Sequence, residues 1–199
     1  MIVLERVPVD LDPDRLAGQA GTDREEAQAF LETAGPYLRP TGCFDEVDPA
    51  GFLGEAASSD WTGPAIIGLV SLGPEAAGAA QPGSGNEALA RALLTLALRE
   101  ALDYVEYRVR QYLKPTGRVP GPRMVPGCPD LPLEVNRMVL NHFRDVPGLG
   151  PGPLDPGRLD PAVSLAFLYP TEVRTKAATS KCDLCQRKDC PARAFHEDI

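Results

Sequence analysis

The sequence predicts an α+β fold in which a mostly antiparallel sheet packs against one long buried helix. Short apolar runs that end at Gly or Pro indicate strands, and a single apolar pattern of helical period is much longer than the others. Strand-type and helix-type segments do not alternate regularly, as an α/β fold would require. With 199 residues, the chain is long enough to form one sizeable core.

The first part of the chain contains three predicted elements. Residues 2–9 alternate apolar and polar side chains, which indicates a strand. A helix is expected over residues 22–38, where Thr22 and Glu25 have the spacing of a capping box. Residues 41–47 predict a second, short strand.

The longest predicted element follows a buried strand. Residues 64–73 form a nearly continuous apolar run, which favours a central strand over a helix at this length. Residues 74–86 are rich in turn-forming residues. Asn86 can then cap a helix that runs to about Leu113. Because the first half of this helix is apolar almost all round, we expect it to be buried against the sheet.

The last third of the chain is interrupted by two stretches rich in Pro and Gly, residues 117–132 and 145–161. Between them, residues 132–143 predict a helix with a proline in its first turn. Residues 163–171 predict the last strand. We therefore expect one α+β domain over residues 1–175 and a separate cysteine-rich tail over residues 176–199.

The net charge of −8 and the isoelectric point near 4.8 argue against a nucleic-acid partner, because binding to phosphates needs clustered Lys and Arg. The sequence contains neither an apolar run of membrane-spanning length nor the pattern of a signal peptide. A cytoplasmic location without membrane contact is the expectation. The five cysteines are then expected to be reduced, which favours a metal or catalytic use over disulfides.

Three cysteines, Cys182, Cys185 and Cys190, lie within nine residues near the end of the sequence. The spacing C-x2-C-x4-C suits thiolates that bind one metal ion or cluster, and a proline after the last thiol is common beside cluster cysteines. Two alternatives remain open for the fourth ligand. An iron–sulfur cluster would take Cys128, Cys43 or an external ligand, whereas zinc would take His196.

A second candidate site is the segment 121–132. Its rigid, Pro- and Gly-rich backbone is suited to cradling a polar ligand, and Arg123 is suited to pairing with a carboxylate. The alternative is a rigid connector that carries a surface arginine. Acid–base or nucleophilic catalysis has little support, since the two histidines, His142 and His196, accompany no nucleophile motif. We therefore assign no catalytic residue.

Four segments in this order resemble the activation (reactivation) domain of vitamin B12-dependent methionine synthase, in a stand-alone form. They are AIIGLVSLGPEA (65–76), ALREALDYVEYRV (97–109), the pattern G-x-R-x-x-P-G-x-P-x-x-P-x-E (121–134) and the ending CPAR (190–193). The resemblance implies a curved α+β fold that binds S-adenosylmethionine beside the cobalamin of a partner. There, an inactive cob(II)alamin is reduced by one electron, and the cob(I)alamin takes a methyl group from S-adenosylmethionine.

The resemblance also implies which residues bind the ligand. Arg123 and Val125 fall on the family's binding positions, in a loop continued by Pro126, Gly127 and Cys128, and Glu100 is the match for the carboxylate that holds the amino group. The partners are a cobalamin-binding methionine synthase or another corrinoid protein, and an electron-donor protein. Taken together with the three thiols, the match leads us to expect that the tail carries an iron–sulfur cluster that relays the electron.

Two departures from the family leave other functions open. Cys128 replaces an aromatic residue, and the cysteine tail stands where the family has a ligand-binding tyrosine. The first alternative is a non-catalytic module that binds a corrinoid protein through a zinc-stapled tail. The second is a reductive activator of another corrinoid methyltransferase that uses no S-adenosylmethionine.

Overall fold

The computed structural model describes residues 1–54, 63–76, 86–147, 149 and 163–173. Their centre is a curved five-stranded sheet in which all neighbouring strands are antiparallel, and this confirms the predicted α+β class. From one edge to the other the strands are β1 (Ile2–Leu4), β2 (Thr41–Val47), β3 (Ala65–Ser71), β5 (Ser164–Val173) and β4 (Arg118–Pro120).

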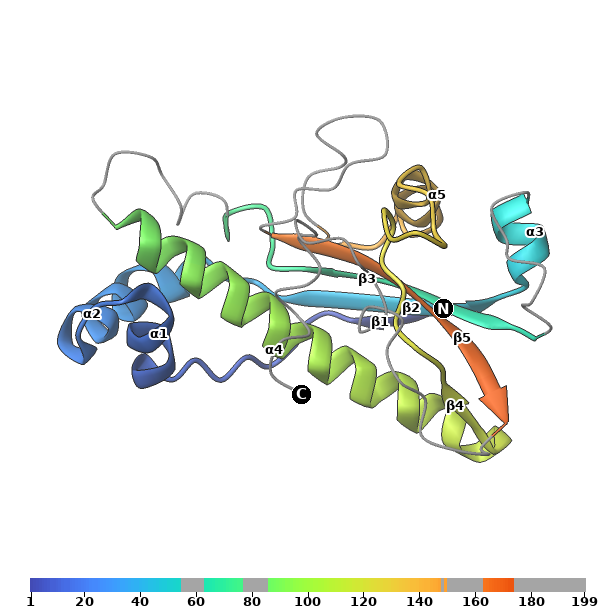
Figure 1. Cartoon of the computed structure of the whole chain (residues 1–199), viewed down its shortest axis with the longest axis horizontal. Helices are drawn as coiled ribbons and strands as arrows, with labels where there is room; N and C mark the ends of the chain where they lie inside the picture. Colours follow the sequence, from blue (N-terminus) through green and yellow to red (C-terminus); the bar gives the residue numbers. More distant parts are fainter. Residues whose placement is uncertain (55–62, 77–85, 148, 150–162, 174–199) are drawn as a thin grey trace.

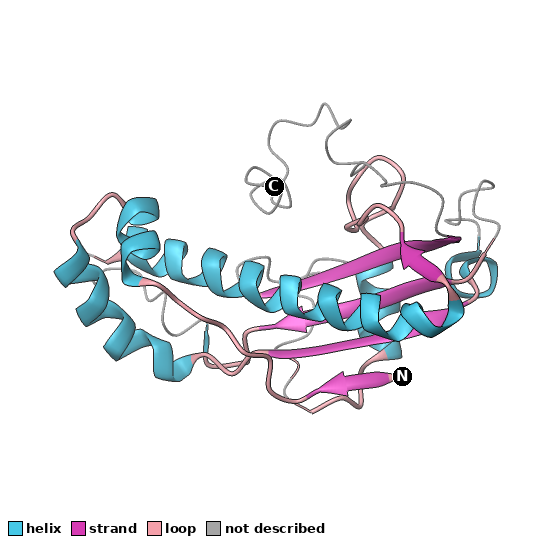
Figure 2. Cartoon of the chain, turned by 90° about the horizontal axis from the view of Figure 1, so that it is seen from below, coloured by secondary structure: helices cyan, strands magenta, loops and turns pink. Residues whose placement is uncertain are grey.

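The longest helix, α4 (Glu87–Leu113), has 27 residues and crosses one face of the sheet diagonally (Figures 1 and 2). Helices α1 and α2 lie beside its N-terminal half, whereas α5 lies on the opposite face of the sheet (Figure 1). The remaining bounds are α1 (Pro13–Ala20), α2 (Arg24–Ala34), η1 (Gly35–Tyr37), α3 (Pro49–Leu53), η4 (Lys114–Thr116) and α5 (Val135–His142).

The sheet separates two hydrophobic clusters because successive side chains of a strand point to opposite faces. On the α4 side, Ile66 and Phe167 join the apolar residues of α1, α2 and α4. On the α5 side, Ile67 and Leu168 join the apolar residues of α5. The first half of α4 is apolar almost all round because α1 and α2 cover the side that the sheet leaves open.

Two glycines in the sheet let α4 and the large side chains of its cluster approach closely. A Cβ atom on Gly42 would lie 2.5 Å from a Cγ atom of Val105 on α4. A Cβ atom on Gly68 would collide with the ring of Phe167 on the neighbouring strand. The lack of a side chain at Gly42 therefore sets how near α4 sits to the sheet.

The strands β2, β3 and β5 and the helix α4 agree closely with the predictions, but three details differ. β1 ends at Leu4 rather than at residue 9, and further on the Val7 amide bonds to the Pro40 carbonyl. The predicted capping box is wrong by one residue, because the Asp23 side chain accepts the amide hydrogen of Glu26. Asn86 stands at the N-cap of α4 without a side-chain hydrogen bond to the first turn.

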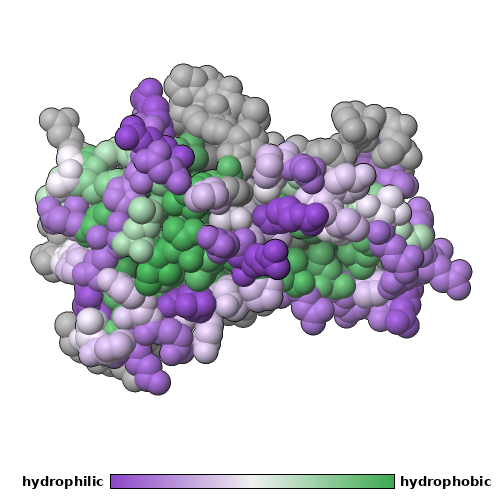
Figure 3. All heavy atoms as spheres, turned by 180° about the vertical axis from the view of Figure 1, so that it is seen from behind, coloured by the Kyte–Doolittle hydropathy of each residue, from purple (hydrophilic) through white to green (hydrophobic). Residues whose placement is uncertain are grey.

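The surface mixes apolar and polar groups. Figure 3 shows that hydrophobic patches on the face opposite to that of Figure 1 are broken up by hydrophilic side chains. The exposed large apolar residues include Tyr107 and Tyr112 on α4. In the part of the chain that the structure describes, no helix has both the length and the apolar character needed to cross a bilayer.

Candidate functional site

The segment that follows β4 continues the sheet edge beside β5. The Gly121 amide donates to the Pro170 carbonyl over 2.7 Å. Met124 and Leu168 then exchange two backbone hydrogen bonds of 2.8 and 2.9 Å. This part of the Pro- and Gly-rich stretch is therefore an ordered edge of the sheet, whereas its composition alone is equally typical of a connector.

The alternation of side chains along this edge decides which way Arg123 lies. Met124 packs in the α5-side cluster, and Val125 packs in the α4-side cluster. Arg123 precedes Val125 by two positions and therefore lies on the same face of the sheet edge. Its guanidinium reaches the Glu106 carboxylate of α4. The two residues expected to bind a ligand thus lie on the α4 face of the sheet edge.

A tight turn follows at Pro126 and Gly127. The Cys128 amide donates to the Val125 carbonyl over 3.0 Å, and the Gly127 amide donates to the Leu131 carbonyl over 2.7 Å. Gly127 has a φ angle of 95°, which residues with a side chain rarely adopt. The backbone geometry therefore explains why this position is a glycine.

The guanidinium of Arg123 belongs to a group of four side chains that we call the Glu106 cluster: Glu106, Arg110, Arg123 and Tyr169. The Arg123 side chain is only 6% exposed, and its Nη1 lies 3.4 Å from Oε2 of Glu106. The Tyr169 hydroxyl donates to the same oxygen over 2.8 Å. Arg110 donates to the other oxygen, Oε1, over 2.6 Å. The cluster joins α4, β5 and the segment after β4.

The charges in the Glu106 cluster stabilise one another. Burial alone would raise the pKa of Glu106, but the hydrogen bonds from Arg110 and Tyr169 and the charge of Arg123 outweigh it, so the pKa lies below its ordinary value. Burial raises the pKa of Tyr169, which keeps its hydroxyl protonated as a donor. At neutral pH the cluster therefore contains an ionised carboxylate between two guanidinium groups.

The charge of Arg123 acts on Asp103, whereas Glu100 pairs with a different arginine. Glu100 accepts a 2.7 Å hydrogen bond from Arg15 of α1. The Asp103 residue as a whole is exposed, but partial burial of its carboxyl raises the pKa of that group. Among the cations that lower this pKa, Arg123 has the largest effect. Sequence reasoning missed Asp103 and Glu106, although their spacing from Arg110 along α4 places all three on one flank of the helix.

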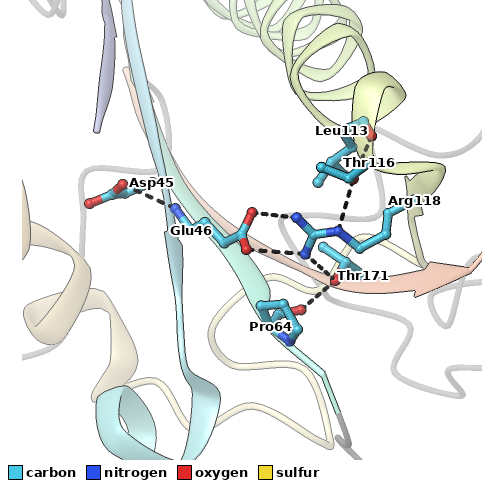
Figure 4. A network of polar contacts seen from close by, with 7 residues as sticks. All are labelled: Asp45, Glu46, Pro64, Leu113, Thr116, Arg118 and Thr171. Carbon is cyan, nitrogen blue, oxygen red and sulfur yellow. Dashed lines mark hydrogen bonds and ion pairs between the residues drawn. The ribbon is translucent and has the colours of Figure 1, made fainter.

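A second polar network holds the end of α4 and the start of the candidate segment (Figure 4). Arg118 of β4 pairs with both carboxylate oxygens of Glu46 on β2, at 3.1 and 2.8 Å. It also donates to the hydroxyls of Thr116, just after α4, and Thr171 on β5. Because the pair is bidentate and only about a fifth to a quarter exposed, at 19% and 26%, it fixes this corner of the sheet.

The two cysteines within the described residues, Cys43 and Cys128, lie on different elements and are buried to different degrees. Cys43 is fully buried on β2, and burial raises the pKa of its thiol to about 12. Burial also raises the pKa of Cys128, which packs at the margin of the α5-side cluster. Both thiols are therefore protonated at neutral pH in this fold.

The predicted metal ligands Cys182, Cys185 and Cys190 lie outside the described residues, as do His196 and the whole tail over residues 176–199. Within the residues that are described, no group of three His, Cys, Asp or Glu side chains is arranged to hold a metal ion. The site in the tail therefore stays a prediction.

The other histidine, His142, has a structural environment. Its Nε2 lies 2.9 Å from Oδ2 of Asp45, and its ring packs edge-to-face against Phe52 and Phe143. These contacts join α5 to β2 and α3.

What the Arg123 region can do chemically follows from its charges. The buried guanidinium of Arg123, on the sheet edge, lowers the pKa of the partly buried Asp103 carboxyl on α4. Such a pair is complementary to a ligand that carries both a carboxylate and an ammonium group.

In comparisons with known proteins, no family model matches the chain, and no curated protein is significantly similar to it.

Proposed function

We propose that this chain reactivates a corrinoid protein, in the manner of the activation domain of vitamin B12-dependent methionine synthase. The client is a cobalamin-binding methionine synthase or another corrinoid protein. S-adenosylmethionine supplies the methyl group, and an electron-donor protein supplies one electron.

One observation carries the proposal: Arg123, in the segment that carries the resemblance, lies on the α4 face, 3.4 Å from the Glu106 carboxylate of α4, and its charge also acts on Asp103. Arg123 would bind the carboxylate of S-adenosylmethionine. Asp103, rather than Glu100, is the better placed group to bind its ammonium, because Glu100 already pairs with Arg15. The turn at Pro126 and Gly127 would bring backbone groups to the same ligand.

The reaction explains why the described residues need no general acid or base. One electron converts cob(II)alamin to cob(I)alamin, whose electron pair forms the new cobalt–carbon bond. The sulfonium–methyl bond breaks at the same time, and S-adenosylhomocysteine leaves as a neutral thioether. No proton moves, so the protein has to position and shield the reactants rather than transfer protons.

Isothermal titration of the full chain with S-adenosylmethionine, alone and with a cobalamin-loaded corrinoid protein, tests the proposal. We expect saturable binding in at least one of the two mixtures. Arg123→Lys keeps the charge but loses the forked geometry, and we expect it to bind at least about tenfold more weakly. Arg144→Lys is the matched control, because Arg144 is exposed and pairs with its chain neighbour Asp145, away from the Glu106 cluster. Absence of binding in both mixtures would refute the proposal.

The tail is proposed to carry an iron–sulfur cluster on Cys182, Cys185 and Cys190. Anaerobic purification followed by metal analysis and absorption spectroscopy tests this assignment. A brown protein with reducible iron supports electron relay. A colourless protein with stoichiometric zinc would instead support the non-catalytic module that docks a corrinoid protein.

One observation favours a second function, the reductive activation of another corrinoid methyltransferase without S-adenosylmethionine. The guanidinium of Arg123 already has an internal carboxylate partner, Glu106. In that case the Glu106 cluster would serve only to fasten α4 to the sheet edge. The chain would then bind a corrinoid protein in pull-down experiments but would give no heat with S-adenosylmethionine.

A further inference from the structure

The pairing between β5 and the chain that begins with β4 contains one extra residue, at the edge of the sheet (Figure 1). Pro120 is paired with Thr171, and Met124 is paired with Leu168. Between these two pairs the edge chain advances by four residues, whereas β5 advances by three. An antiparallel strand that gains one residue on its partner contains a β-bulge.

Backbone hydrogen bonds show where the bulge lies. Before it, the Gly121 amide donates to the Pro170 carbonyl over 2.7 Å, which keeps the register of β4. After it, Met124 and Leu168 exchange two hydrogen bonds, and this pair is already in the shifted register. The extra residue is therefore inserted between positions 121 and 124.

Pro122 and Arg123 occupy this interval, and together they face a single residue of β5, Tyr169. A proline fits there, since one residue of a bulge is left without a ladder hydrogen bond. The glycine before it allows a close approach, because a Cβ atom on Gly121 would lie only 2.9 Å from the Pro170 carbonyl oxygen. The Gly-Pro pair thus matches the backbone that the bulge requires.

The bulge changes the face to which Arg123 belongs. Tyr169 packs in the α4-side cluster, and Pro120 shares its face because it is paired with the residue two positions further along β5. In a regular continuation of β4, position 122 would face α4 and Arg123 would face α5. With the extra residue, Arg123 instead lies on the α4 face, where its Nη1 is 3.4 Å from Oε2 of Glu106.

We propose that this bulge positions Arg123 for ligand binding, and that Gly121 and Pro122 are the positioning residues that form it. The inference rests on the proposed function, because it takes Arg123 as the group that binds the carboxylate of the ligand. It assigns a role to two residues that have no polar side chain and that act only through the direction of the arginine.

Nuclear magnetic resonance of the ligand-free chain tests the positioning directly. Arg123 and the Tyr169 hydroxyl approach the same carboxylate oxygen of Glu106, so we expect a nuclear Overhauser contact between these two side chains. Gly121→Ala forces the edge to shift and should abolish this contact. The amide of Met124, which is bonded to β5 just after the bulge, should exchange at least about tenfold faster in the variant.

A double-mutant cycle on S-adenosylmethionine affinity then connects the bulge to binding. We expect Gly121→Ala to weaken binding at least about tenfold in the wild-type background. In an Arg123→Lys background the same change should alter affinity less than about threefold, because the positioned guanidinium is already gone. Pro122→Ala is a milder variant that still tolerates the bulge, so it should weaken binding less than Gly121→Ala does.

Two control variants separate positioning from a general loss of stability. Val139→Ala removes two methyl groups from a fully buried side chain of α5, in the cluster on the opposite face of the sheet. Gly18→Ala adds a Cβ atom that meets nothing within 4 Å. Both should bind S-adenosylmethionine like the wild type and keep the contact between Arg123 and Tyr169. Circular dichroism of every variant checks that the fold is retained.

The outcomes distinguish this inference from the proposed function. If Gly121→Ala keeps both the contact and the affinity, the inference is wrong and the proposed function stands. Equal losses of affinity in the two backgrounds, or a loss of affinity while the contact remains, also overturn the inference, because Gly121 would then not act through Arg123. If the wild type binds no S-adenosylmethionine, the proposed function falls, and the contact alone decides whether the bulge positions Arg123.

Discussion

The contact between Gly42 on β2 and Val105 on α4 sets the distance between the long helix and the sheet. Gly42→Ala places a Cβ atom 2.5 Å from a Cγ atom of Val105, which is well inside ordinary van der Waals contact. Val105 is fully buried, so it has no open space to turn into. Either α4 must move outward or both side chains must be strained.

The expected cost follows from two opposing effects. Overpacking of this kind costs about 1–3 kcal/mol. Alanine recovers about 0.5–1 kcal/mol because it loses less backbone entropy than glycine on folding. We therefore expect Gly42→Ala to lower the free energy of unfolding by about 1–2 kcal/mol.

A second substitution should relieve the clash. In a Val105→Ala background, the nearest neighbours of the new methyl are Val7 at 3.5 Å and the Cβ atom of residue 105 at 3.8 Å, which are ordinary contacts. The new methyl also fills part of the space that Val105 leaves. The two substitutions together should cost about 2 kcal/mol less than the sum of the single costs.

Urea denaturation followed by far-UV circular dichroism measures all of these values. Gly18→Ala is the matched control, because Gly18 lies in α1 and a Cβ atom added there would meet nothing within 4 Å. That control should be stabilised by up to about 1 kcal/mol. If Gly42→Ala is as stable as the wild type, or if Val105→Ala gives no relief, the close contact does not govern the packing of α4.

Three other predictions follow from the polar and thiol groups. Glu46→Gln should lower the free energy of unfolding by about 1–2 kcal/mol, measured by urea denaturation, because it leaves Arg118 without its bidentate partner; an unchanged midpoint would contradict this. Burial raises the pKa of Asp45, but hydrogen bonds from the N-terminal amine and His142 lower it overall below 3.8. The contribution of Asp45 to the free energy of unfolding is therefore present above pH 3.8 and is lost as the pH falls through the lower pKa of the folded protein. The wild type should therefore lose more stability on acidification than Asp45→Asn, and equal acid sensitivity of the two would refute the assignment. Burial raises the pKa of Cys43 from 9.0 to about 12. The contribution of this protonated thiol to the free energy of unfolding is therefore present below pH 9.0 and is lost as the pH rises toward 12. Cys43 should resist alkylation at neutral pH until the protein unfolds, as mass spectrometry of labelled peptides can show, and rapid labelling of the folded protein would contradict its burial.

Much of the fold could be predicted because its main elements carry strong local patterns. β3 and β5 are buried on both faces and appear as continuous apolar runs, and α4 is long enough for its period to be unmistakable. The three-residue strand β4 escaped prediction, since Arg118–Pro120 has no periodicity and becomes a strand only by pairing with β5. The short helix α1 was missed for a similar reason, because it buries only Leu16 and Ala17 among its residues.

The residues of the candidate site could likewise be predicted from the sequence only in part. Arg123 could be selected from the sequence because Pro and Gly around it define a rigid segment, and two backbone hydrogen bonds to β5 in fact hold that segment. Glu100, Asp103 and Glu106 are equivalent as sequence, since each is an acidic residue on one long helix. Only the direction in which each side chain leaves α4 separates them, and Glu100 meets Arg15 whereas Glu106 meets Arg123.

The sequence by itself determined the fold class, the central strands and the long helix, because burial on one or all sides imposes a period that is visible locally. Tertiary structure alone decided which carboxylate meets the buried guanidinium. That choice depends on how α4 is rotated and how closely it approaches the sheet, and the contact between Gly42 and Val105 sets this approach across residues distant in the chain. A period records which face of a helix is buried, but it contains no information about what lies opposite that face.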